Sequence, residues 1–106
     1  MENMQVKIRK IRNQIVKNYN PQKIILFGSF AFEKQNPNSD VDLLIIKETK
    51  KDHYKRIPEV RACLHNINQA FDILVMTPRE IEKRLKLGDF FIEEIMKKGE
   101  VLYERK

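Results

Sequence analysis

Two aspartates, one residue apart, precede an apolar run in the segment LFGSFAFEKQNPNSDVDLLII, residues 26–46. Aspartate is a poor strand former and is seldom buried without a partner. Because side chains alternate along a strand, Asp40 and Asp42 are expected to point to the same side, about 6–7 Å apart. Two carboxylates so placed repel each other unless a cation lies between them. Mg²⁺ suits this position, since it prefers oxygen ligands and is typically held by one or two carboxylates plus substrate phosphates.

Gly28 and Ser29 end an earlier apolar run and offer groups that suit a phosphate. Glycine has no Cβ, so a phosphate can approach its backbone closely. If Ser29 caps one short helical turn over residues 29–34, its hydroxyl and the free backbone N–H groups form an anion site. Phosphate donors beside a two-carboxylate metal site predict a metal–nucleoside triphosphate complex.

A third aspartate, Asp72, is the only charged residue in the apolar run AFDILV. On a neighbouring strand it would complete a cluster of three carboxylates. Such a cluster can bind a second metal ion or accept a proton from an attacking hydroxyl, as two-metal phosphoryl transfer requires. Taken singly, each aspartate could be an ordinary turn or strand-start residue, and Gly-Ser is common in loops. The combination indicates a catalytic site.

The elements that must position these residues follow from periodicity and capping residues. Buried strands are expected over residues 23–27, 42–46 and 71–76, with a short closing strand over residues 100–104. Helices are predicted over residues 3–18, from near Pro58 onward, over residues 78–87 and over residues 90–98. Thr77 and Asp89 are the expected N-caps of the last two helices, and Gly88 and Gly99 their stops.

Strands that alternate with helices predict an α/β domain with a small mixed β-sheet and helices packed on it. The connection between the first two strands has room for only one helical turn. A parallel crossover needs a dozen or more residues, so these two strands are expected to be antiparallel. The whole chain, residues 1–106, fits a single domain of this kind.

The composition narrows the function classes. The net charge is +6 and the pI is about 9.5, but the basic residues are spread over every segment and mixed with glutamate. This pattern is typical of solvated helix faces and favours a phosphorylated ligand or an acidic partner over nucleic acid. A lone Cys63 cannot form an internal disulfide. No apolar stretch approaches the ~18 residues of a membrane span, and no signal peptide is evident, so a cytoplasmic location is expected.

The segment GSFAFEKQNPNSDVD resembles the signature of the DNA polymerase beta-type nucleotidyltransferase superfamily: Gly-Ser, ten residues, then Asp-x-Asp. Asp72 in FDILV matches the third carboxylate of that family. The short chain and the ending TPREIEKRLKLGDFFIEEIMKKGEVLYE are similar to the minimal nucleotidyltransferase branch, in which the catalytic core stands nearly alone. Many members of this branch are antitoxins encoded beside a HEPN-family toxin.

The resemblance implies a polymerase beta-like fold and a role for each matching residue. Gly28 and Ser29 would bind the triphosphate, while Asp40, Asp42 and Asp72 would be catalytic and hold Mg²⁺, with two ions expected. The implied reaction is transfer of AMP from ATP to a hydroxyl, with a tyrosine of a partner HEPN toxin as the acceptor.

One departure from the branch lies just after Ser29. Many minimal members have Arg-Gly where this chain has Phe32 and Glu33. A possible phosphate contact is thereby absent, and a negative charge is added near the triphosphate. Two alternatives stay open on the sequence alone: an antitoxin that binds nucleotide but inhibits its partner by contact, and transfer to a small molecule such as an aminoglycoside. A homo- or hetero-oligomer fits any of these.

Overall fold

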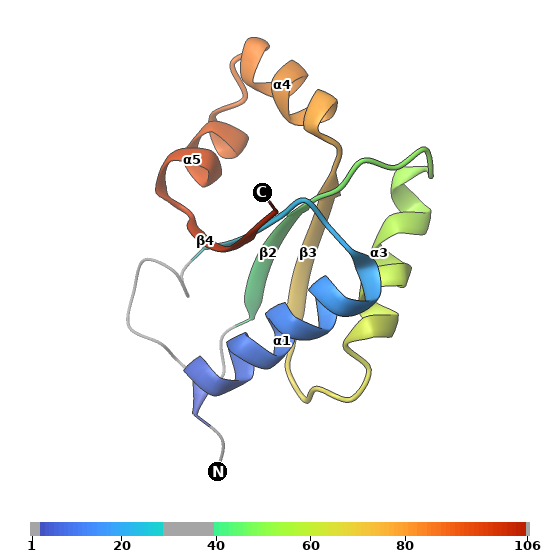
Figure 1. Ribbon diagram of the computed structural model, residues 1–106. Coiled ribbons are helices and arrows are strands. Elements are labelled where there is room, and N and C mark those ends of the chain that lie inside the picture. The colour runs from blue at the N-terminus through green and yellow to red at the C-terminus, as the bar shows by residue number, and fades with distance from the viewer. Residues whose placement is uncertain (1–2, 29–39, 106) are drawn as a thin grey trace.

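The computed structural model describes residues 3–28 and 40–105 (Figure 1). The elements, in chain order, are α1 (Met4–Tyr19), β1 (Lys23–Phe27), β2 (Val41–Ile46), α3 (His53–Cys63), β3 (Phe71–Met76), α4 (Pro78–Lys86), α5 (Phe90–Lys98) and β4 (Glu100–Glu104). The helical turn expected over residues 29–34, together with Ser29, Phe32 and Glu33, lies outside the described residues. No helix within the described ranges is long and apolar enough to cross a bilayer.

The four strands form one mixed sheet in the order β3-β2-β1-β4. β1 is antiparallel to both of its neighbours, whereas β2 and β3 are parallel and joined through α3. The antiparallel pairing predicted for β1 and β2 is therefore confirmed.

Helices cover both faces of the sheet: α1 and α3 pack on one face, and α4 and α5 on the other (Figure 1). The sheet side chains of the first face include Ile24, Leu26, Val41, Leu43, Ile45, Ile73 and Val75. Those of the second include Ile25, Phe27, Leu44, Ile46, Leu74 and Met76. Because side chains alternate along a strand, Asp42 and Asp72 belong to the second face, which carries α4 and α5.

The caps predicted for the last two helices are present. Thr77 and Glu80 form a reciprocal capping box at the start of α4. The Asp89 carboxylate accepts hydrogen bonds from the backbone N–H groups of Phe91 and Ile92 at 3.0 and 3.1 Å, which fixes the start of α5. Gly88, between the two helices, has φ of +79°, a conformation that glycine adopts without strain.

The predicted start of α3 near Pro58 is wrong, because the helix begins five residues earlier, at His53. Proline inside a helix removes one N–H donor, here the one that would have bonded to the carbonyl of Tyr54. Tyr54 is 70% exposed, so water can solvate that carbonyl. The first turn is stabilised instead by Arg56, which is only 5% exposed.

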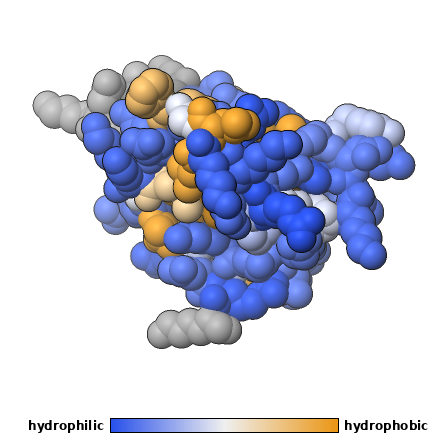
Figure 2. Space-filling model, turned by 90° about the horizontal axis from the view of Figure 1, so that it is seen from above, coloured by the Kyte–Doolittle hydropathy of each residue, from blue (hydrophilic) through white to orange (hydrophobic). Residues whose placement is uncertain are grey.

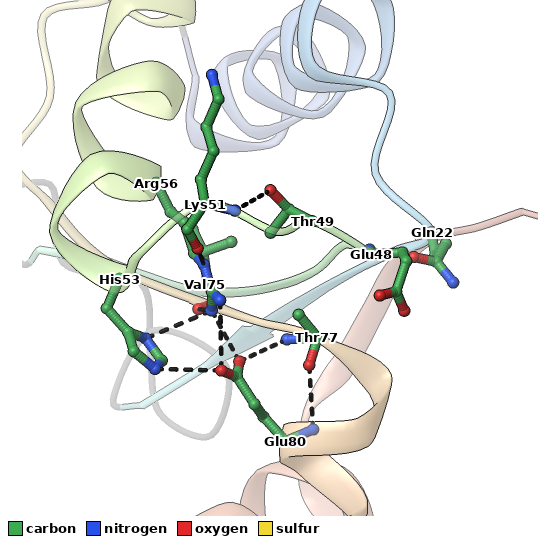
Figure 3. A network of polar contacts seen from close by, with 9 residues as sticks. All are labelled: Gln22, Glu48, Thr49, Lys51, His53, Arg56, Val75, Thr77 and Glu80. Carbon is green, nitrogen blue, oxygen red and sulfur yellow. Dashed lines mark hydrogen bonds and ion pairs between the residues drawn. The ribbon is translucent and has the colours of Figure 1, made fainter.

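Arg56 connects three elements through a polar network (Figure 3). Its Nη1 donates to Glu80 Oε1 at 2.7 Å and to the Val75 carbonyl at 3.2 Å, and its Nε donates to the Lys51 carbonyl at 2.8 Å. Glu80 Oε1 also accepts the backbone N–H of Thr77 at 2.8 Å. The network therefore holds α3, the end of β3 and the start of α4 in one arrangement.

Glu80 makes this network sensitive to acid. Burial raises its pKa, but the Arg56 hydrogen bond, the Thr77 N–H and nearby positive charge outweigh burial, so the net pKa lies below the ordinary 4.5. A carboxyl whose pKa is lowered by folding stabilises the fold above that ordinary pKa, and this contribution is lost as the pH falls through the folded pKa. The free energy of unfolding should therefore decline below pH 4.5.

Replacement of Glu80 tests this expectation. At pH 7, Glu80→Gln should lower the free energy of unfolding by about 2–3 kcal/mol, because it leaves the buried Arg56 charge unpaired. Below pH 4.5 the difference from wild type should shrink. Glu82→Gln is the matched control on the same helix: its ion pair with Lys86 is exposed, so we expect at most about 0.5 kcal/mol. Urea denaturation at several pH values measures both, and an equal loss in the two variants would contradict the prediction.

Candidate active site

A row of three side chains crosses the sheet on the face that carries α4 and α5. Asp42 on β2 is paired with Phe27 on β1 and with Asp72 on β3. Neighbouring strands are about 4.8 Å apart, so the two carboxylates of this row lie side by side. The structure thus brings together Asp42 and Asp72, which are 30 positions apart in the sequence.

Asp40 lies one residue before β2 begins. The following backbone N–H, that of Val41, donates to the Ala70 carbonyl at 2.9 Å, so the starts of β2 and β3 are joined here. Asp40 and Asp72 are exposed, whereas Asp42 is half-buried. The pKa of Asp42 is raised, first by burial and then by the negative charges of Asp72 and Asp40. The three aspartates therefore lie close enough to act on one another.

Gly28 completes the site at the end of β1. Its φ is +79°, and a Cβ at this position would lie 2.0 Å from Oδ2 of Asp42 and 2.9 Å from its Cγ. Only a residue without a side chain leaves room for that carboxylate. The backbone of Gly28 thus lies against the carboxylate of the central aspartate of the row, and its role as a phosphate ligand stays a prediction. Ser29, the other predicted phosphate ligand, lies outside the described residues.

The donor set suits a hard cation such as Mg²⁺, because it consists of carboxylate oxygens that repel one another. Within residues 3–28 and 40–105, no group of three or more His, Cys, Asp or Glu side chains is arranged to hold a metal ion. Asp42 and Asp72 instead form a neighbouring pair. Such a pair matches the usual way of holding Mg²⁺, in which one or two carboxylates act together with substrate phosphates.

Sequence reasoning missed the aromatic side of the site. The Phe91 ring from α5 packs edge-on against the Phe27 ring, with centroids 5.7 Å apart and an interplanar angle of 82°. Phe27 directly precedes Gly28, and this position was the signal in the sequence that could have assigned it to the site. Its pairing with Asp42 is seen in the structure. Phe91 lies too far along the chain for any local pattern to connect it.

The comparisons with known proteins agree with this geometry. Residues 9–106 match the family described as Polymerase beta, Nucleotidyltransferase. The chain belongs to this nucleotidyltransferase family. The resemblance and the polymerase beta-like fold predicted from the sequence are therefore confirmed. No curated protein matches the chain.

Solved structures share the fold of this nucleotidyltransferase at low sequence identity. A Sulfolobus solfataricus protein described as a "putative nucleotidyltransferase" has a TM-score of 0.67 at 17% identity, with 96% of this chain and 81% of that chain covered. A toxin–antitoxin structure with AMP-PNP has a TM-score of 0.63 at 20% identity, covering 92% and 73%. The toxin–antitoxin MntA-HepT has a TM-score of 0.60 at 18% identity, covering 96% and 74%.

The contact between Gly28 and Asp42 yields a paired prediction, because Gly28 and Gly88 share a φ of +79° but not their surroundings. Alanine at either position should cost about 1–2 kcal/mol of stability from backbone strain. Only Gly28→Ala also displaces the Asp42 carboxylate, since nothing lies within 4 Å of a Cβ at Gly88. We expect Gly28→Ala to weaken binding of Mg·ATP at least about tenfold and Gly88→Ala to leave it unchanged, as measured by calorimetry. Unchanged affinity in Gly28→Ala would place the nucleotide elsewhere.

Repulsion among the aspartates should lower the stability of the ligand-free protein, while the same carboxylates are needed to bind Mg·ATP. Burial and like charge disfavour ionised Asp42, so Asp42→Asn should raise the melting temperature by a few degrees at pH 7 in the absence of Mg²⁺. Addition of Mg·ATP should stabilise the wild type but not this variant. Asp52→Asn serves as the control, because the Asp52 side chain makes no cap hydrogen bond. A lower melting temperature for Asp42→Asn without Mg²⁺ would contradict the electrostatic account.

Proposed function

We propose that this nucleotidyltransferase is a Mg²⁺-dependent enzyme that transfers AMP from ATP to a hydroxyl of a partner protein. The acceptor we propose is a tyrosine of a HEPN-family toxin, so that the protein acts as an antitoxin. One observation carries the proposal: Asp42 and Asp72 are paired in register, with the backbone of Gly28 against Asp42. Phosphate and metal groups would therefore meet on one face of the sheet.

Each residue of the site has a distinct part in the proposed reaction. Gly28 and Ser29 would bind the triphosphate, and Asp40 and Asp42 would hold Mg²⁺, with Asp72 completing the metal site. When bound, Mg²⁺ supplies positive charge that offsets the charge of the phosphates. The close approach of Gly28 to Asp42 brings the phosphate-binding backbone and a metal-binding carboxylate within contact of each other.

Asp72 is the residue that we propose as the acceptor of the proton from the attacking hydroxyl. The acceptor oxygen forms a bond to the α-phosphorus of ATP, and the bond from that phosphorus to the oxygen bridging the α- and β-phosphates breaks. Pyrophosphate leaves with the electron pair of the broken bond, and the proton of the acceptor hydroxyl passes to the Asp72 carboxylate. The exposure of Asp72 suits this part, because a hydroxyl on a large acceptor can reach it.

The exposure of the site also supports an acceptor on a separate protein. Asp40 and Asp72 are both exposed, so an incoming protein surface can supply the remaining walls of the site. Two proteins that share this fold are described as toxin–antitoxin assemblies, one of them with AMP-PNP. These neighbours support a toxin partner and an adenine nucleotide for this chain.

A labelling experiment tests the reaction directly. The protein is incubated with Mg²⁺ and the product of the neighbouring gene, as the proposed toxin, using ATP labelled at the α- or at the γ-phosphate in parallel. We expect label on the toxin from α-labelled ATP alone, because AMP is transferred and pyrophosphate is released. Asp40→Asn should lower the labelling rate at least about a hundredfold, in keeping with the loss of one metal ligand.

The outcome separates the proposal from its alternatives. Label from γ-labelled ATP would indicate phosphate transfer and contradict the proposed reaction. Tight binding of the two proteins with no transfer of label would favour an antitoxin that inhibits by contact. In that case inhibition of the toxin should need no ATP and should survive Asp40→Asn.

A further inference from the structure

A cavity of about 300 Å³ lies at the β3 edge of the sheet, between β3 and the helices α3, α4 and α5. Its walls include Ile57, Leu74, Met76, Arg84, Phe91 and Ile92. The lining is mainly apolar, with a few polar groups at its margin. This combination is typical of sites for small organic ligands, and the volume is at the lower end of their range.

The cavity and the aspartate row share one strand, β3. Leu74 and Met76 follow Asp72 by two and four positions, so all three side chains lie on one face of that strand. The strand rise places Leu74 about 7 Å from Asp72. A ligand in the cavity is therefore one side chain away from the carboxylates.

Phe91 links the cavity to the phosphate end of the site. It lines the cavity, and its ring also packs edge-on against Phe27. Phe27 is paired with Asp42, the aspartate in contact with Gly28. A molecule whose phosphates lie at Gly28 and Asp42 can thus reach the cavity by crossing only the Phe27–Phe91 pair.

The chemistry of the cavity matches a flat, aromatic group with polar edges. Phe91 is 54% exposed, so part of its ring is free to stack. The Arg84 guanidinium, 3.9 Å from the Asp89 carboxylate, adds donors at the margin. Figure 2 shows apolar side chains gathered in a strip, bordered by hydrophilic ones, on the side of the molecule that carries α4. A nucleobase has this shape and these edges, and stacking on an aromatic side chain is a common way to bind one.

We infer that this cavity binds the nucleobase of the nucleotide, stacked on Phe91, while the phosphates lie at Gly28 and Asp42. The inference rests on the proposed function, because it assumes a nucleoside triphosphate at the aspartate row. It adds to that function a binding site for the base, built from α3, β3, α4 and α5. An apolar side chain of a protein partner is the competing occupant.

Calorimetry with two ligands separates base binding from phosphate binding. Mg·ATP and Mg·tripolyphosphate carry the same chain of phosphates, but only ATP has a base. The wild type should bind ATP at least about tenfold more tightly than tripolyphosphate, since stacking strengthens binding. Phe91→Ala should weaken ATP binding about tenfold and leave tripolyphosphate binding unchanged.

Phe90 supplies the matched control, because it is the neighbouring aromatic, is 83% exposed and does not line the cavity. Phe90→Ala should bind both ligands like the wild type. Phe91→Leu keeps the apolar bulk against Phe27 but not the aromatic ring. It should fold like the wild type by thermal denaturation and still lose affinity for ATP, which excludes misfolding as the cause.

Each contrary result has a distinct meaning. Equal affinity of the wild type for ATP and tripolyphosphate would overturn the base site but leave the proposed phosphate site in place. Phe91 variants that bind ATP normally but need more toxin acceptor for half-maximal labelling would also overturn it, in favour of a partner side chain in the cavity. Failure of the wild type to bind either ligand would overturn the proposed function together with this inference.

Discussion

The pairing register of β2 is the constraint on which the site depends. β2 lies inside the sheet, with Asp42 opposite Phe27 on one side and Asp72 on the other. A slip of one residue would turn Asp42 toward α1 and α3, into a fully apolar core. It would also bring Val41 or Leu43 to the aspartate row. The cost of burying an unpaired carboxylate thus excludes the neighbouring registers and fixes the site at the same time.

Helices on both faces hold that register. β2 has buried residues on both sides, Leu43 and Ile45 against α1 and α3, and Leu44 and Ile46 against α4 and α5. Asp42 is the only polar residue of β2 and is the second residue of that strand. The Arg56–Glu80 network fixes the opposite end of the sheet, where α3, β3 and α4 meet. One end of the sheet is therefore held by a satisfied ion pair, while carboxylates of like charge lie at the other.

Much of this fold can be predicted from the sequence, because its strands are short apolar runs and its last two helices have strong caps. Thr77 and Asp89 act within three residues of their own positions, so local reasoning is sufficient. The start of α3 could not be predicted, since it depends on the tertiary contact between Arg56 and Glu80 rather than on Pro58. The same holds for Phe91, which joins the candidate site only through packing on Phe27. The aspartates could be singled out from the sequence because Asp40 and Asp42 stand at the start of one apolar run and Asp72 interrupts another, while their catalytic role stays a prediction.

The crowding of Gly28 against Asp42 has a consequence for the lifetime of the protein. The carboxylates of the site oppose folding as long as their charge is uncompensated. A ligand that binds only the folded chain increases its stability by mass action. The fraction of chains that is open to proteolysis would then follow the local supply of cation and nucleotide. The proposed binding of cation and nucleotide would in this way couple the abundance of the protein to the energy state of the cell.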